Sequence, residues 1–304
     1  MSLTASAYLA WIVVCIVWGT TYLAIRVALE TIPPFLMASF RWLAAGSCLT
    51  IALVARGERM PGPGAWPSLA VLGVLLMGVG NGGVVWAEQT VPSGLTAVLV
   101  AGIPFWMVGV ERVMYGGDRI TRGRLAGLVV GFAGIVLLVW PELQLGGGGE
   151  TAAGSGSGRI DRSSFLGGVA ATQMACLGWA IGSSIARRRQ HDENVLAASA
   201  LQMVGAGLAL GVVGLARGEW AEVAFSDRTA GALAYLIVAG SIVGYSAYAY
   251  ALKHLPLATV SLYAYVNPVI AVALGTLLLR EPLSSRMVTA AAAVLAGVIL
   301  VRRG

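Results

Sequence analysis

The sequence predicts an all-α membrane protein in which ten transmembrane helices form two inverted repeats of five. Hydrophobic residues make up 58% of the 304 residues and charged residues only 11%, against about 25% charged residues in ordinary soluble domains. The apolar residues gather in runs of about 20, the length of a helix that crosses a hydrocarbon core about 30 Å thick. A Gly- and Ser-rich segment then divides these runs into two equal groups.

The expected helices are bounded by segments that hold nearly all of the charge. Proline marks two of their starts: Pro33 and Pro34 stand before the second span and Pro92 before the fourth, and proline is tolerated only in the first turn of a helix. The expected spans are residues 7–29, 34–55, 67–87, 94–114, 123–140, 164–186, 195–216, 229–252, 258–279 and 286–302.

Lys and Arg predict the orientation, because positively charged loops are retained in the cytoplasm. With the N-terminus inside, the inside segments hold 12 of the 20 Lys and Arg residues and the outside segments hold 6, while Arg26 and Arg41 fall within spans. This bias predicts that both termini are cytoplasmic. Topology also accounts for the net charge of +6, so we expect no nucleic-acid partner.

The longest hydrophilic stretch is residues 141–163, PELQLGGGGETAAGSGSGRIDRS, which has the composition of a flexible linker. It separates an expected first repeat, residues 1–140, from an expected second repeat, residues 164–304. Each repeat has an odd number of crossings, so the second copy must run through the membrane in the opposite direction.

Sequence similarities between the two parts support a repeat. WGTTYLAIR, from Trp18 to Arg26, is echoed by WAIGSSIAR, from Trp179 to Arg187. Two proline pairs keep one spacing of 164 residues: Pro92 with Pro256, and Pro104 with Pro268. Inverted repeats of this kind place a substrate site at the repeat interface, near the middle of the bilayer.

Three segments resemble an EamA-type permease of the drug/metabolite transporter superfamily: WGTTYLAIRVALETIPPFLMASFRWLAAG, NGGVVWAEQTVPSGLTAVLVAGIP and SLYAYVNPVIAVALGTLLLREPLS. The resemblance covers nearly the whole chain. It implies a transporter of the bacterial inner membrane that exports amino acids or related metabolites through a cavity between the two repeats. Efflux of drugs or nucleosides is the alternative, and a membrane-embedded enzyme is a further reading for which no catalytic motif appears.

Amides and prolines within spans are the first candidate site residues. Asn81 and Asn267 each carry a primary amide that needs partners in hydrocarbon, so both should face the protein interior or a cavity. Pro104 and Pro268 are expected helix breaks, which lipid tolerates only where protein or a cavity surrounds them. Either pair also fits a purely structural role in packing.

Aromatic residues deep within the spans are the second group. Their rings fit apolar substrate groups, and an indole N–H or a phenol O–H needs a hydrogen-bond partner when buried. Packing between helices explains each of them equally well. The candidate substrate-binding residues of this group are Trp18, Trp106, Trp179, Tyr245, Tyr248 and Tyr265.

Charged residues within spans are costly and therefore informative. Arg41 either attracts a substrate carboxylate or pairs with Glu30 or Glu88, and we expect the structural pairing. Glu88 is the best remaining candidate for proton coupling, because no Asp or Glu falls at mid-depth in a span.

No cofactor or metal is expected, since the three cysteines lack metal-ligand spacing. Small residues in two spans form faces for close helix approach, namely Gly123, Gly127, Gly131 and Gly134 in the fifth and Ala293 and Gly297 in the tenth. These faces fit internal packing or dimerisation. The expected partners are therefore a small-molecule substrate and the lipid bilayer, with the chain a monomer or a homodimer.

Overall fold

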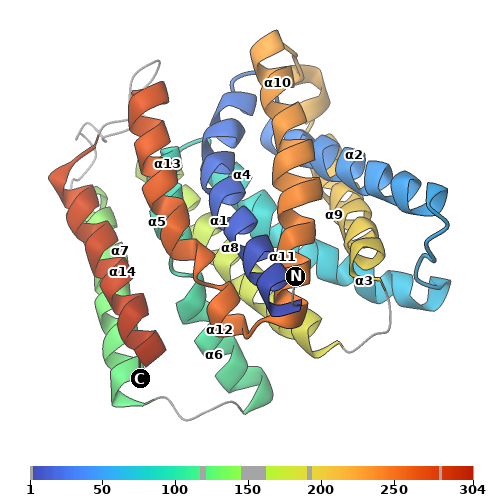
Figure 1. The fold of residues 1–304 in the computed structure, drawn as a ribbon. Helices are drawn as coiled ribbons and strands as arrows, with labels where there is room; N and C mark the ends of the chain where they lie inside the picture. The colour runs from blue at the N-terminus through green and yellow to red at the C-terminus, as the bar shows by residue number, and fades with distance from the viewer. Residues whose placement is uncertain (1–2, 117–120, 145–161, 190–193, 281–282, 304) are drawn as a thin grey trace.

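The computed structural model describes residues 3–116, 121–144, 162–189, 194–280 and 283–303. Across these ranges the chain is helical and forms no β-strand (Figure 1). The prediction of an all-α protein is thus confirmed. The expected linker, 141–163, falls mostly outside the described residues.

Helices occupy every interval that the sequence marked as a span. In the first part of the chain these are α1 (Leu3–Ala28), α2 (Pro34–Ala55), η1 (Pro63–Ala65), α3 (Trp66–Gly73), η2 (Val74–Asn81), α4 (Gly82–Ala87), α5 (Ser93–Val100), α6 (Ile103–Tyr115) and α7 (Arg122–Gln144). In the second part they are α8 (Arg162–Arg188), α9 (Val195–Ala216), η3 (Glu219–Glu222), α10 (Asp227–Tyr235), η4 (Leu236–Val243), α11 (Gly244–His254), α12 (Leu257–Val260), α13 (Tyr263–Leu279) and α14 (Ser285–Arg303).

Within the described residues, 7 continuous helical runs have the length and apolarity needed to cross a membrane. Three shorter apolar helices, Leu125–Leu137, Val266–Leu279 and Ser285–Gly297, occupy the remaining expected spans. The arrangement of ten crossings in two repeats stays a prediction.

Two of the long runs contain a π-helical turn that the sequence did not predict. Residues Pro63–Ala87 pass through η2, and Asp227–His254 pass through η4, before each returns to α-helix. π-Helical turns are rare and occur frequently at functional sites, because they change the direction in which neighbouring side chains and carbonyls point. The two segments are each 8 residues long.

The expected breaks at Pro104 and Pro268 are placed differently. A break separates α5 from α6, and Pro104 lies in the first turn of α6, where a missing N–H costs nothing. The matching break separates α12 from α13, whereas Pro268 lies inside α13. Both spans are interrupted, but only the first interruption adjoins its proline.

Small residues bring α7 and α14 into backbone contact. A Cβ atom added to Gly297 would lie 2.4 Å from the backbone nitrogen of Gly131 and 2.6 Å from the carbonyl oxygen of Gly127. No side chain fits between the two helices at this point. The glycine face predicted in the fifth span is therefore used for packing within the chain.

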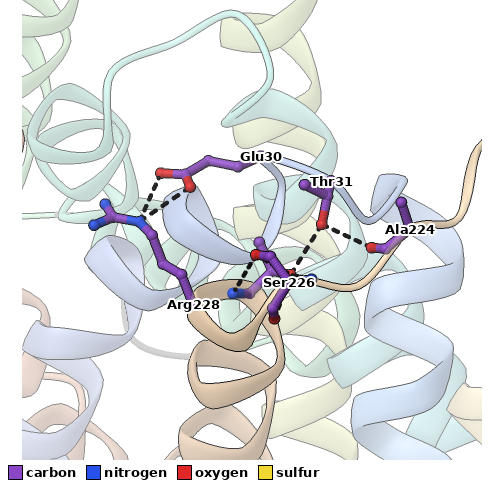
Figure 2. Close-up of polar contacts among 6 residues, drawn as sticks. Glu30, Thr31, Ala224, Ser226 and Arg228 are labelled. Carbon is purple, nitrogen blue, oxygen red and sulfur yellow. Dashed lines mark hydrogen bonds and ion pairs between the residues drawn. The ribbon is translucent and has the colours of Figure 1, made fainter.

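Polar contacts join the two parts of the chain at the end of the bundle where α1 ends and α10 begins (Figure 2). Arg228 donates from Nε to Glu30 over 3.0 Å. Beside this ion pair, the Thr31 hydroxyl donates to the carbonyl oxygen of Ala224 over 2.7 Å, and Ser226 caps the first turn of α10. Glu30 and Thr31 belong to the first part of the chain, and their partners belong to the second.

Candidate functional site

A cavity of about 60 Å³ lies in the interior, and we call it the central cavity. It has room for several water molecules, at about 10–15 Å³ each, and is much smaller than the about 300–1,000 Å³ of a drug-sized site. Both parts of the chain contribute to its walls. The lining residues used below are Trp18, Thr21, Tyr22, Arg41, Trp42, Asn81, Cys176, Trp179, Tyr263 and Asn267.

Arg41 is held in this cavity by the two π-helical segments. Its Nε donates to the hydroxyl of Ser241 in η4 over 2.7 Å, and its Nη1 donates to the side-chain oxygen of Asn81 at the end of η2 over 3.3 Å. The side chain is 2% exposed, and the guanidinium also lies 4.5 Å from the centre of the Trp42 ring. The π-helical turns thus present the two oxygens that fix this buried cation.

Aromatic rings form the wall of the cavity. The indole N–H of Trp18 donates to the carbonyl oxygen of Gly240 over 3.0 Å, and its ring meets Trp179 edge-on at 5.4 Å. The Trp179 indole in turn donates to the hydroxyl of Tyr248 over 3.2 Å. That hydroxyl also shares a hydrogen bond of 2.8 Å with Ser183. The indole groups of Trp18 and Trp179 and the hydroxyl of Tyr248 thus all have partners, which fixes the orientation of these three rings.

Asn267 lies deep in α13 and is 2% exposed. With its amide nitrogen turned toward the available acceptors, it donates to the carbonyl oxygens of Cys15 over 3.0 Å and Tyr263 over 3.1 Å. These bonds join α13 to α1. The amide is therefore a tie between two helices that also borders the central cavity.

A second and larger cavity of about 850 Å³, which we call the basic vestibule, lies beside the aromatic layer. Its lining includes Arg187, Arg189 and Lys253, together with Tyr245 and Tyr248. Because Lys253 and Arg228 lie at opposite ends of the run Asp227–His254, the vestibule lies at the opposite end of the bundle from the Glu30 ion pair.

The structure brings together most of the predicted site residues, but in two groups. Trp18, Arg41, Asn81, Trp179 and Asn267 line the central cavity. Tyr245 and Tyr248 line the basic vestibule instead, where the Tyr245 hydroxyl donates to Gln202 over 2.5 Å.

Two predicted aromatic residues are placed elsewhere. The indole of Trp106 donates to Gln173 over 3.1 Å and packs edge-on against Phe132, and Trp106 is not among the described residues that line either cavity. The side chain of Tyr265 falls outside the described part of the structure.

The carboxylates proposed as partners of Arg41 also differ. Glu30 pairs with Arg228 where α1 ends and α10 begins. Glu88 is fully buried and attracts Arg41 electrostatically, while its backbone carbonyl accepts a hydrogen bond from Arg26. The hydrogen bonds of Arg41 itself go to neutral oxygens.

Sequence reasoning missed several cavity residues that a helical spacing would have found. Thr21, Tyr22 and Ile25 follow Trp18 at intervals of three, four and seven residues, which places them on one helix face, and all line the cavity. Among the described residues, no group of three or more His, Cys, Asp and Glu side chains is arranged to hold a metal ion.

Comparison with known proteins then identifies the family. The EamA-like transporter family matches residues 5–140 and 166–303. This chain belongs to that family. It is 34% identical to the uncharacterized inner membrane transporter YedA of Escherichia coli K12, over 95% of this chain and 88% of the relative. The uncharacterized transporter YvbV of Bacillus subtilis is 24% identical over 94% of this chain and 86% of its own length.

A solved crystal structure shares the fold. It superposes with a TM-score of 0.66 over 97% of this chain and 96% of that chain, at 19% identity. Family membership makes the chain a membrane transporter rather than an enzyme. The cavities described above are therefore cavities within a transporter.

Proposed function

We propose that this EamA-like transporter moves small metabolites, and amino acids in particular, out across the bacterial inner membrane by alternating access. The observation that carries the proposal is the composition of the central cavity. Trp18 and Asn81 from the first part of the chain line it together with Trp179 and Asn267 from the second. Amides orient the polar groups of a small zwitterion, and aromatic faces attract an ammonium group and cover an apolar side chain.

The small volume favours small solutes. A cavity of about 60 Å³ must widen even for an amino acid, and a multidrug substrate of several hundred Å³ would require a far larger rearrangement. Apolar walls with a few fixed polar groups are the usual design of a specific small-molecule site. The cavity therefore fits amino acids better than drugs or nucleosides.

Matched contacts in the two parts of the chain support inverted repeats with residues 1–140 and 164–304 as the two units. Arg26 donates to the backbone carbonyl of Glu88, at the end of α4. Arg187, at the position expected to match it, donates to the carbonyls of Leu252 and Leu255, at the end of α11. In each part an arginine that ends the first span binds the open carbonyls at the end of the third.

The π-helical segments match in the same way. η2 and η4 each occupy the middle of the third span of their part, and both contribute to the setting of Arg41. An alternating-access mechanism needs two such units that rock about a shared site. Polar contacts at Glu30 join the two parts of the chain at one end of the bundle and the basic vestibule lies at the other, an arrangement that fits one conformation of that cycle.

We further propose that both termini are cytoplasmic, which places the basic vestibule on the cytoplasmic side. The excess of Lys and Arg in the segments on that side supports this orientation. The name of YedA as an inner membrane transporter supports the location. A reporter fused to the C-terminus, active only in the cytoplasm, checks the orientation.

The test is efflux of radiolabelled amino acids from proteoliposomes preloaded with a defined mixture, with and without an imposed proton gradient. We expect protein-dependent efflux of a subset of amino acids, reduced by about tenfold or more in Trp179→Ala and Asn267→Ala. Trp220→Ala is the matched control, because Trp220 is 64% exposed and distant in sequence from the cavity residues. If the folded protein moves no amino acid, the substrate assignment fails, and drugs and nucleosides become the next candidates.

A further inference from the structure

The central cavity carries a positive charge of its own. Arg41 is the one charged residue among the described residues that line it. The buried carboxylate that acts on it electrostatically, Glu88, does not line the cavity, and the hydrogen bonds of Arg41 go to neutral oxygens. The described lining thus carries one positive charge and no negative charge. Because an unbalanced buried charge is unfavourable, the site favours an anionic group on a ligand.

The hydrogen bonds of Arg41 leave part of the guanidinium available. Its Nε and Nη1 donate to the neutral oxygens of Ser241 and Asn81. No hydrogen bond joins its Nη2 to the residues that the structure describes. A guanidinium that presents an open N–H edge is well suited to a carboxylate, which it binds more strongly than a neutral acceptor.

A second donor, on the residue next to Arg41, has no acceptor. The indole nitrogen of Trp42 is buried without a hydrogen-bond partner within the described part of the chain, and the residue is 2% exposed. Trp42 lines the central cavity beside Arg41. Buried indole N–H groups are normally paired, so this orphan donor is available to an acceptor that a ligand brings when the cavity widens.

We infer that Arg41 and Trp42 bind the carboxylate of the transported substrate, which defines the substrates as amino acids and other small monocarboxylates. This inference rests on the proposed function and adds the chemical group that the transporter recognises. The rings of Trp18, Trp179 and Tyr263 cover the rest of the molecule. An amine of the same size offers these donors no acceptor, and an amide offers a neutral oxygen in place of the charged one, which binds a guanidinium less strongly.

The competing account gives Arg41 a structural role only, as a bridge between η2 and η4. The two accounts differ in what a carboxylate adds to affinity. Loss of a bridge weakens every ligand equally, whereas loss of a carboxylate partner weakens only ligands that carry the carboxylate.

The experiment measures binding of matched ligand pairs to purified protein by competition and by thermal stabilisation. The pairs are phenylalanine with phenylalaninamide, leucine with leucinamide, and threonine with threoninamide. We expect the wild type to prefer the acid by about tenfold or more, the usual effect of a hydrogen bond to a charged group. In Arg41→Gln the preference should fall to near one, with affinity for the amide changed by less than about threefold.

Trp42→Phe is the second variant, since it removes the orphan N–H and keeps the ring, and it should lower the preference by about threefold. It keeps the inference testable if Arg41→Gln does not fold. Arg228→Gln is the control at the Glu30 end of the bundle and should retain the preference. Equal loss of acid and amide binding in both variants, or no preference in the wild type, would overturn the carboxylate site while leaving transport intact. If the wild type binds and moves none of these compounds, the proposed function fails with it.

Discussion

The two cavities of this EamA-like transporter differ in size and polarity. The central cavity holds about 60 Å³ and is enclosed mainly by aromatic and aliphatic side chains around Arg41. The basic vestibule holds about 850 Å³ and is lined by Arg187, Arg189 and Lys253. Trp179 lines the central cavity and Tyr248 lines the basic vestibule, and a hydrogen bond joins the two side chains.

The difference in size and polarity favours separate roles for the two cavities, one in substrate selection and one in substrate entry. A large basic chamber is well hydrated and imposes little shape on a ligand, although it raises the local concentration of anions. A small cavity with fixed donors discriminates between ligands by shape and by hydrogen bonds. We therefore propose that substrate recognition takes place in the central cavity and entry in the basic vestibule.

The largest expected difference is in transport rate, when a larger side chain is placed in each cavity in turn. Ala175 lines the central cavity and Ala249 lines the basic vestibule. Ala175→Leu should reduce the initial rate of transport by about tenfold to a hundredfold, because the added carbons occupy the small cavity. Ala249→Leu should reduce it by less than about twofold. Transport in proteoliposomes measures both, and equal effects would remove the distinction between the cavities.

The boundary between the cavities should be sensitive to a single hydroxyl. Tyr248→Phe removes the bonds to Trp179 and Ser183, each worth about 1 kcal/mol. We expect the apparent affinity for substrate to fall by about fivefold, because the rings that border the cavity lose their fixed orientation. Tyr235→Phe is the matched control, since its hydroxyl bonds Thr20 on a partly exposed surface. A larger effect of the control would contradict the role of the aromatic layer.

A third prediction concerns the helix that carries Arg41. The buried carboxylate of Glu219 accepts a hydrogen bond of 2.8 Å from the backbone N–H of Leu36, in the first turn of α2. Glu219→Ala should lower the stability by about 0.5–2 kcal/mol, as for other lost caps. Glu219→Gln keeps an acceptor and should lower it less. Thermal unfolding in detergent measures both.

The same residue predicts a pH dependence. Burial raises the pKa of the Glu219 carboxyl above its ordinary value. The folded protein therefore holds this proton more tightly than the unfolded chain, and the resulting stabilisation is present below about pH 4, the unfolded value. It is lost as the pH rises through the folded pKa. The melting temperature of the wild type should thus fall relative to Glu219→Gln between pH 4 and 8, and parallel curves would contradict this.

The smallest effects are expected from the exposed ion pairs at the two ends. Glu111 binds Arg188 through both oxygens, at 2.7 and 2.5 Å, and the guanidinium stacks on Tyr115. At the other end, Glu30 binds a single nitrogen of Arg228. Glu111→Gln should lower the stability by about 0.5–1 kcal/mol and Glu30→Gln by less, because bidentate pairs are stronger. Thermal unfolding at low and high salt checks the order.

Much of the fold was predictable because hydropathy and proline determine where helices in a membrane begin and end. The second expected span, 34–55, coincides with α2 (Pro34–Ala55), which starts at the proline that marked it. The π-helical segments were not predictable, because they depend on the hydrogen-bond register rather than on residue type. The break between α12 and α13 was also not predictable from residue type, because it lies before Tyr263 rather than at Pro268.

The site was predictable only in part because the helices are apolar on every side. An amphipathic pattern shows which face of a helix is buried, but a helix surrounded by lipid and protein lacks that pattern. Trp18 and Trp179 were found because they open matching segments, whereas Trp106 bonds Gln173 away from both cavities. Trp42 was not singled out, since nothing in the sequence distinguishes it from an aromatic packing residue.

The most direct test of the central claim is protection of a cysteine by substrate. Cys176 lines the central cavity, so a variant with Cys15→Ala and Cys48→Ala retains it as the one reporter. A second variant that also carries Cys176→Ala and Ala249→Cys reports on the basic vestibule. A small thiol reagent should label the reporter in the central cavity about fivefold more slowly when a transported amino acid is present, with little change in the vestibule. Protection of the vestibule alone would contradict the assignment of recognition to the central cavity.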